Sequence, residues 1–152
     1  MTEPEWKQLE ILIAKIQQEL APEATVSHNV KLMGRQSETL RQIDVLVHQR
    51  IGQYEMRIII DCKDYATPVD VNGVGEFLAV VNDVGAQKGA MVCPKGFTEA
   101  AKVFAKNAQI DLYSPVDTDP HKWQVKATAP MLCDFRGVKI SFGISASAPV
   151  SE

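Results

Sequence analysis

Two apolar segments around a glycine-led turn constrain the fold of this chain more than any other feature. The segments "RQIDVLVHQ" and "YEMRIIIDCK" flank "IGQY", and both are rich in the β-branched residues that favour strands. A loop formed by Gly52 and Gln53, with glycine first, suits a two-residue type II′ turn. The pattern therefore predicts an antiparallel β-hairpin in which Ile51 lies opposite Tyr54.

The register of this hairpin assigns the charged side chains to one face. Counting back from the turn places Asp44 directly opposite Asp61, with Lys63 on the same face, because residues two apart in a strand share a face. Cys62 falls on the opposite face. A three- or five-residue loop would break this parity. The charged face also carries Leu46 and Ile59, and the opposite face carries Ile43, Val45, Val47, Ile58 and Ile60.

Two directly opposed carboxylates are unfavourable unless something compensates them. Mg²⁺ is a hard cation that binds through one or two carboxylates together with substrate phosphate. A lysine beside such a metal adds positive charge where a phosphoryl transition state gains negative charge. Asp44, Asp61 and Lys63 are therefore suited to metal-assisted phosphodiester hydrolysis. The plainer interpretation is that both aspartates end their strands in water and that Lys63 neutralises one of them.

The remaining segments alternate between helical and strand patterns. We expect helices over residues 4–20, 73–86 and 97–108, and further strands over 25–34, 88–93 and 110–114. Asn72 and Thr98 are the expected N-caps of the second and third helices, and Ala100, Val103 and Phe104 are expected to face inward. The order predicts an α/β fold in which a mixed central β-sheet, a three-strand meander followed by strand-helix-strand, is flanked by helices.

Composition excludes several classes of protein. Three widely spaced cysteines favour neither a disulfide framework nor a zinc site, so we expect a reducing, cytoplasmic setting. No apolar run approaches the roughly 20 residues of a membrane span. Gly73-Val74-Gly75 lacks the third glycine of a dinucleotide fingerprint, so no organic cofactor is expected. The net charge of −3 argues against a protein that coats nucleic acid, but a local binding patch remains compatible with it.

The chain resembles the restriction-endonuclease-like nucleases, specifically the Mrr-like branch of the PD-(D/E)xK superfamily. The motifs "LEILIAKI", "RQIDVLV", "IIIDCKDY" and "VGAQKGAMVCPKGFTEAAKVFAKNAQIDLY" carry the resemblance in the expected order. It implies a DNA endonuclease domain over residues 1–114, followed by an extension over 115–152 that contains possible extra strands. Two residues depart from the family pattern: Ile43 stands where the motif has proline, and Asp61 stands where glutamate is commoner.

The resemblance also implies roles for individual residues. Asp44 and Asp61 would bind Mg²⁺, with Mn²⁺ as a substitute, and Lys63 would be the catalytic lysine. Glu10 on the first helix would be an accessory carboxylate at the metal. The resemblance also makes a homodimer an expectation, since one small domain makes a single cut. The alternative is a catalytically inactive nucleic-acid-binding or assembly module that retains the nuclease fold.

Three basic residues are candidate contacts to DNA phosphates. Arg35 follows the first expected strand, Arg41 begins the second, and Lys95 lies in the Pro-Lys-Gly turn. Arginine and lysine commonly contact phosphate oxygens. Ordinary surface charge explains the same residues equally well.

Overall fold

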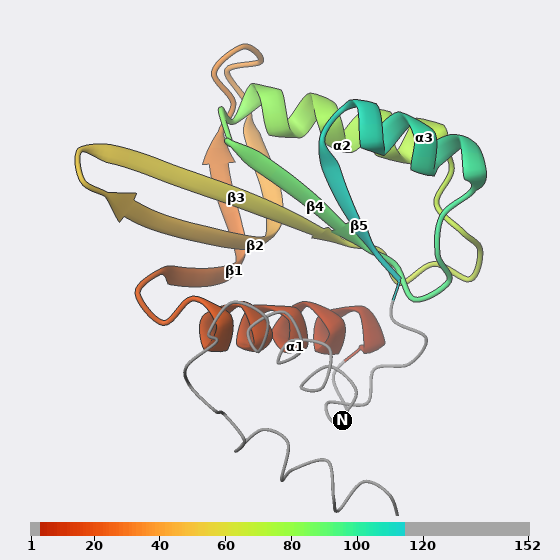
Figure 1. Ribbon diagram of the computed structural model, residues 1–152, viewed down its shortest axis with the longest axis horizontal. Coiled ribbons are helices and arrows are strands. Elements are labelled where there is room, and N and C mark those ends of the chain that lie inside the picture. Colours follow the sequence, from red (N-terminus) through yellow and green to blue (C-terminus); the bar gives the residue numbers. More distant parts are fainter. Residues whose placement is uncertain (1–3, 115–152) are drawn as a thin grey trace, which may run out of the picture. The chain divides into compact units, whose positions relative to one another are not determined.

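A computed structural model describes residues 4–114, which form three helices and a five-stranded sheet (Figure 1). The elements in chain order are α1 (Glu5–Leu20), β1 (Thr25–Met33), β2 (Leu40–Ile51), β3 (Tyr54–Cys62), α2 (Val71–Asp83), β4 (Lys88–Val92), α3 (Glu99–Asn107) and β5 (Ile110–Tyr113). The expected strands over 115–152 lie outside the described residues, so that prediction stays open.

The sheet has the strand order β1-β2-β3-β4-β5. The first three strands pair antiparallel, whereas β3, β4 and β5 pair parallel. Helix α1 covers one face of the sheet, and α2 and α3 cover the other (Figure 1). This arrangement confirms the predicted α/β fold with a mixed sheet between helices.

A buried apolar cluster fills the space between the sheet and the helices α2 and α3. It contains Ile59 and Met91 from the sheet, Val74 and Phe77 from α2, and Ala101 from α3. Each fully buried aliphatic or aromatic side chain of this kind contributes about 1.5–3 kcal/mol of hydrophobic free energy. Val74, Phe77 and Val81 lie on the buried face of α2, which packs against β4 and α3.

The helix boundaries follow capping chemistry. The side chain of Thr98 accepts from Ala101 N–H, as predicted. The N-cap of α2 is Asp70, whose side chain accepts from Gly73 N–H, so the prediction of Asn72 was wrong by two residues. Both are good capping residues, and the chain uses the earlier one.

The inward face of α3 also differs from the prediction. Ala101 and Ala105 are buried, whereas Ala100 is exposed and Val103 is 61% exposed. Of the three predicted residues, only Phe104 packs against the core. Small side chains on the buried face allow α3 to approach the sheet closely. The packing free energy gained in this way exceeds the hydrophobic free energy that burial of Val103 would give. On α1, Trp6 and Leu20 remain exposed at the helix ends, while Leu9 and Ile13 are buried.

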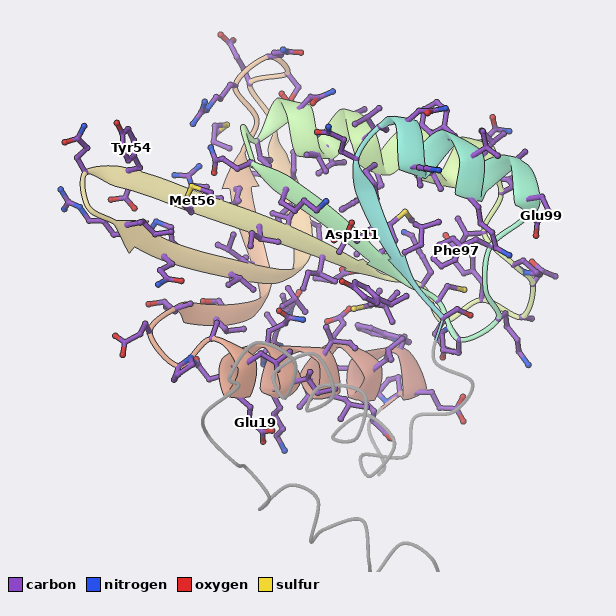
Figure 2. All side chains as sticks on the ribbon, in the orientation of Figure 1. Glu19, Tyr54, Met56, Phe97, Glu99 and Asp111 are labelled. Carbon is purple, nitrogen blue, oxygen red and sulfur yellow. The ribbon has the colours of Figure 1, made fainter. Side chains whose placement is uncertain are left out.

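The β2–β3 hairpin has the predicted turn and register. Ile51 pairs with Tyr54 and Val45 pairs with Ile60. Gly52 has a φ of 61°, and the backbone of Gln53 is not in the positive-φ region, as a type II′ turn requires. The hairpin projects beyond the neighbouring strands, and Tyr54 lies near its tip (Figure 2).

Candidate active site

The candidate site forms where β2 separates from β3. Their paired residues run from Ile51–Tyr54 to Val45–Ile60 and stop there. Beyond that point a side chain replaces backbone pairing between the two strands, because Cys62 N–H of β3 donates to Asp44 Oδ2 of β2 at 2.8 Å. The predicted neighbourhood of Asp44 and Asp61 is therefore present, although the two residues do not form a paired position of the ladder.

The alternation of β2 breaks at the same point. Ile43 was predicted on the face of Val45, but it belongs to the apolar cluster under α2, together with Ile59. Opposite Asp44, the β1–β2 pairing passes over Asn29, whose φ is 53°. A left-handed residue in a strand interrupts regular pleating. At this irregularity the Asp44 carboxylate accepts from the backbone of β3 and also lines the pocket described below.

Asp61 and Lys63 form an ion pair at the end of β3. Lys63 Nζ lies 3.1 Å from Asp61 Oδ2, and their side chains are 29% and 19% exposed. Asp61 Oδ2 is buried and has no hydrogen bond of good geometry within the described residues. A buried carboxylate oxygen with this single ionic contact retains capacity for a further cation.

The electrostatics of the site follow from its burial. Burial raises the pKa of Asp61 to about 6, Lys63 lowers it, and Asp44 adds to the rise. Burial opposes the charge of Lys63, but the Asp61 carboxylate outweighs burial and raises the pKa of the ammonium. Lys63 therefore stays protonated and acts as a fixed positive charge.

Glu10 approaches the same carboxylates from α1. It is 6% exposed, and burial followed by the charges of Asp44 and Asp61 raises its pKa to about 7. Within residues 4–114, no group of three or more His, Cys, Asp or Glu side chains is placed to hold a metal ion. Metal ligation by Asp44, Asp61 and Glu10 therefore stays a prediction.

A pocket of about 210 Å³ opens from these residues toward α2. Asp44, Asp61 and Lys63 lie on its sheet side, and Glu76 and Val80 of α2 lie on its helix side. No local sequence signal marks Glu76 or Val80 as part of the site. Only the packing of α2 over the sheet brings them there.

Tyr65 is a second neighbour that the sequence interpretation missed. Lys63 Nζ lies 5.6 Å from the centroid of the Tyr65 ring, within the range of a cation–π interaction. The spacing of two residues after the lysine is a signal that could have identified it. Cys62, by contrast, is buried, and burial raises the pKa of its thiol, as expected for a core residue.

Asp83, at the end of α2, fastens the β1–β2 loop. Its carboxylate accepts from Gln36 N–H at 2.9 Å, from Ser37 N–H at 3.0 Å and from Ser37 Oγ at 2.6 Å. Hydrogen bonds from Ser37, then from Gln36, and the nearby Arg41 lower the pKa of Asp83 to about 2. We call this contact the Asp83 clamp.

The three predicted DNA contacts have different surroundings. Arg41 Nε lies 2.8 Å from Asp83 Oδ2, so its charge is already compensated within the clamp. The Arg35 guanidinium lies over Gly85, which leaves no room for a side chain there. Lys95 is exposed in the turn before α3. Contact of any of them with DNA stays a prediction.

A family model described as Mrr_cat, restriction endonuclease, matches residues 1–117. The chain belongs to this restriction endonuclease family. The match includes every residue of the candidate site and agrees with the resemblance seen in the sequence. No curated protein matches the sequence.

Solved structures show similar folds. A protein of unknown function, AF1548, is 25% identical with a TM-score of 0.57, over 70% of this chain and 56% of that chain. Can2 from Sulfobacillus thermosulfidooxidans, solved with cyclic tetra-adenylate, is 17% identical with a TM-score of 0.53, over 77% and 34%. The MspJI restriction endonuclease, solved with a 27-mer oligonucleotide, is 12% identical with a TM-score of 0.49, over 90% and 33%.

This chain therefore matches between about a third and just over half of the length of these solved chains. Along residues 4–114, none of the helices is long and apolar enough to cross a membrane.

Proposed function

We propose that this chain is a divalent-metal-dependent endonuclease that hydrolyses phosphodiester bonds in DNA. The observation that supports the proposal best is the convergence of Asp44, Asp61 and Lys63 at the separating ends of β2 and β3. Asp61 Oδ2 is buried without a well-formed hydrogen bond, and Lys63 Nζ lies 3.1 Å from it. Membership of the restriction endonuclease family supports the same reaction class.

The residues present fit a hard divalent cation. Mg²⁺ favours carboxylate oxygen and commonly binds through one or two carboxylates, with water and substrate phosphate completing its coordination. Asp44 and Asp61 would hold the ion, with Mn²⁺ as a substitute. When bound, the metal would polarise the phosphoryl oxygens and lower the pKa of a coordinated water.

The protein side chains would orient the phosphate and stabilise its transition state. The Lys63 ammonium is held by Asp61 and by the Tyr65 ring, so it can face the non-bridging oxygens as negative charge develops on them. Asp44 is fixed by the N–H of Cys62, which limits the movement of its carboxylate. Such preorganisation is a large part of catalysis in phosphoryl transfer.

DNA as the substrate, phosphate contacts by Arg35, Arg41 and Lys95, a homodimer and a cytoplasmic location belong to the same proposal. Exposed Lys95 and Arg35 are better placed for DNA than Arg41, whose guanidinium is paired with Asp83. Analytical ultracentrifugation with and without an oligonucleotide measures the oligomeric state directly.

Cleavage of plasmid DNA with Mg²⁺, Mn²⁺ or EDTA tests the proposal. We expect Asp61→Asn and Lys63→Ala each to lower the cleavage rate by about 10²–10³-fold or more, because the first removes a carboxylate that would hold the metal and the second removes a positive charge at the phosphate. The matched control is Asp64→Asn, an exposed carboxylate beside Lys63, which should cleave at the wild-type rate. Equal cleavage by all four folded proteins would refute the assigned site.

One observation favours a second function, a catalytically inactive nucleic-acid-binding or assembly module. Within the described part of the chain, no three potential metal ligands are grouped around one point. Calorimetric titration with Mn²⁺ separates the two proposals. Binding that is present in the wild type and lost in Asp44→Asn supports the enzyme, whereas no binding in either supports the inactive module.

A further inference from the structure

The pocket beside the candidate site has a composition that metal binding and phosphate chemistry do not require. Asp44, Asp61 and Lys63 occupy one part of its sheet wall. The rest of its lining includes the partly buried Val80 and a floor formed by Ile59 and Phe77, which belong to the core and are 1% and 6% exposed. A phosphate and its hydrated cation gain nothing from apolar walls, so these walls point to another part of the substrate.

The size of the pocket limits what can enter. Its volume is about 210 Å³, whereas pockets that hold drug-sized molecules usually measure about 300–1,000 Å³. A single nucleoside is smaller than a typical drug, and a base pair is too large. The pocket therefore suits one base with its sugar, located next to the phosphate at Asp44 and Asp61.

The charge of the pocket does not favour a second phosphate. Glu76 lies on its α2 side and has no ion pair or hydrogen bond through its side chain within residues 4–114. Together with Asp44 and Asp61 it gives three carboxylates against the single ammonium of Lys63. With the proposed divalent cation bound, these charges sum to about zero, so the pocket has no excess positive charge for a second phosphate and accepts an uncharged group more readily. The exposed Gln42 amide, also part of the lining, donates to Asn29 Oδ1 at 2.6 Å and keeps its carbonyl oxygen and one further N–H for a base edge.

We propose that this pocket holds one unstacked nucleoside of the cleaved strand, next to the scissile phosphate, so that the enzyme prefers DNA with unpaired nucleotides. The inference rests on the proposed nuclease function and names the form of DNA that this site accepts. A base inside a duplex must leave its stack and its partner to enter such a pocket, whereas a base in a single strand has already lost its partner. Packing against apolar side chains such as Val80 tolerates different bases, because every base has an apolar face.

Filling the pocket tests the inference. Val80 lies in its α2 wall and is partly buried, so Val80→Phe places a phenyl ring where the nucleoside would lie. Val80→Leu fills less space and serves if the larger change impairs folding. Ala79→Phe is the matched control, because Ala79 is exposed and does not line the pocket. Thermal unfolding and Mn²⁺ calorimetry confirm that each variant keeps its fold and its metal affinity.

The assay compares one end-labelled oligonucleotide as a single strand and as a duplex, with Mg²⁺ or Mn²⁺. We expect wild-type kcat/KM to be at least tenfold higher for the single strand. Val80→Phe should lower single-strand cleavage at least tenfold, Val80→Leu should lower it less, and Ala79→Phe should leave it unchanged. Equal or faster cleavage of the duplex by wild type, or equal rates for the variants at 79 and 80, would overturn the inference alone. No cleavage of either substrate would overturn the proposed function itself.

Discussion

Replacing Glu10 with glutamine should stabilise the metal-free protein at alkaline pH. Glu10 is buried on α1, and burial followed by the charges of Asp44 and Asp61 raises its pKa from 4.5 to about 7. Glutamine has the same shape but never ionises. The substitution therefore removes the repulsion among three carboxylates without leaving a cavity.

The sign and size of this effect follow from proton linkage. Between pH 4.5 and 7 the folded protein keeps a proton that the unfolded chain has released, so stability falls as the pH rises through this range. A pKa rise of this size corresponds to at most about 3 kcal/mol. Allowing for relaxation of the site, we expect Glu10→Gln to add about 1–3 kcal/mol at pH 8 and close to nothing at pH 4.

Urea unfolding in EDTA, monitored by circular dichroism at pH 4, 6 and 8, measures this difference. The matched control is Glu19→Gln, the same substitution on the same helix at an exposed side chain that points away from the sheet (Figure 2). Its free energy of unfolding should change little with pH relative to wild type. A stability difference for Glu10→Gln that does not depend on pH would refute the placement of Glu10 beside Asp44 and Asp61.

Three further predictions concern other contacts of the site and its support. A Cβ at Gly34 would lie 2.2 Å from Asp83 Oδ2, so Gly34→Ala should lower the free energy of unfolding by about 1–3 kcal/mol; an unchanged urea midpoint would contradict the Asp83 clamp. Tyr65→Leu removes the ring near Lys63 and should lower kcat about 3- to 10-fold at unchanged KM, whereas Tyr65→Phe should retain kcat within about twofold. The Cys62 thiol is buried, so peptide mapping should find it alkylated at pH 8 only after unfolding.

The hairpin could be predicted from sequence because the length of its turn determines every residue pair of its register. Once Gly52 and Gln53 are taken as a two-residue turn, each pair toward Val45–Ile60 follows without further information, and the structure confirms them. The fold class was equally accessible, since alternating strand and helix patterns leave few arrangements of a sheet between helices. Most of the fold could therefore be predicted from strong local sequence patterns with a fixed period.

Features that depend on irregular backbone or distant contacts were not accessible. The break in alternation near Ile43 accompanies a positive φ at Asn29. Asparagine tolerates this conformation better than most residues, but the strand pattern around it does not show which residue will adopt it. The Asp83 clamp joins Asp83 to two residues that lie 46 and 47 positions earlier in the chain. No local sequence pattern predicts a contact over that distance. On α3, two neighbouring faces of the helix could have turned toward the sheet. Which one does so depends on how closely alanine side chains let the helix approach.

The hydrogen bond from Cys62 N–H to Asp44 Oδ2 has a consequence for how such a domain would lose its activity over evolution. Asparagine at position 44 could still accept this bond, whereas alanine would leave the partly buried N–H of Cys62 unsatisfied. The contacts of the Lys63 side chain within the described residues are to the side chains of Asp61 and Tyr65, not to the backbone. In a lineage released from selection for cleavage, we therefore expect the lysine to change first and position 44 to drift toward asparagine. The order in which positions 63 and 44 are substituted would show which of the two residues the fold itself requires.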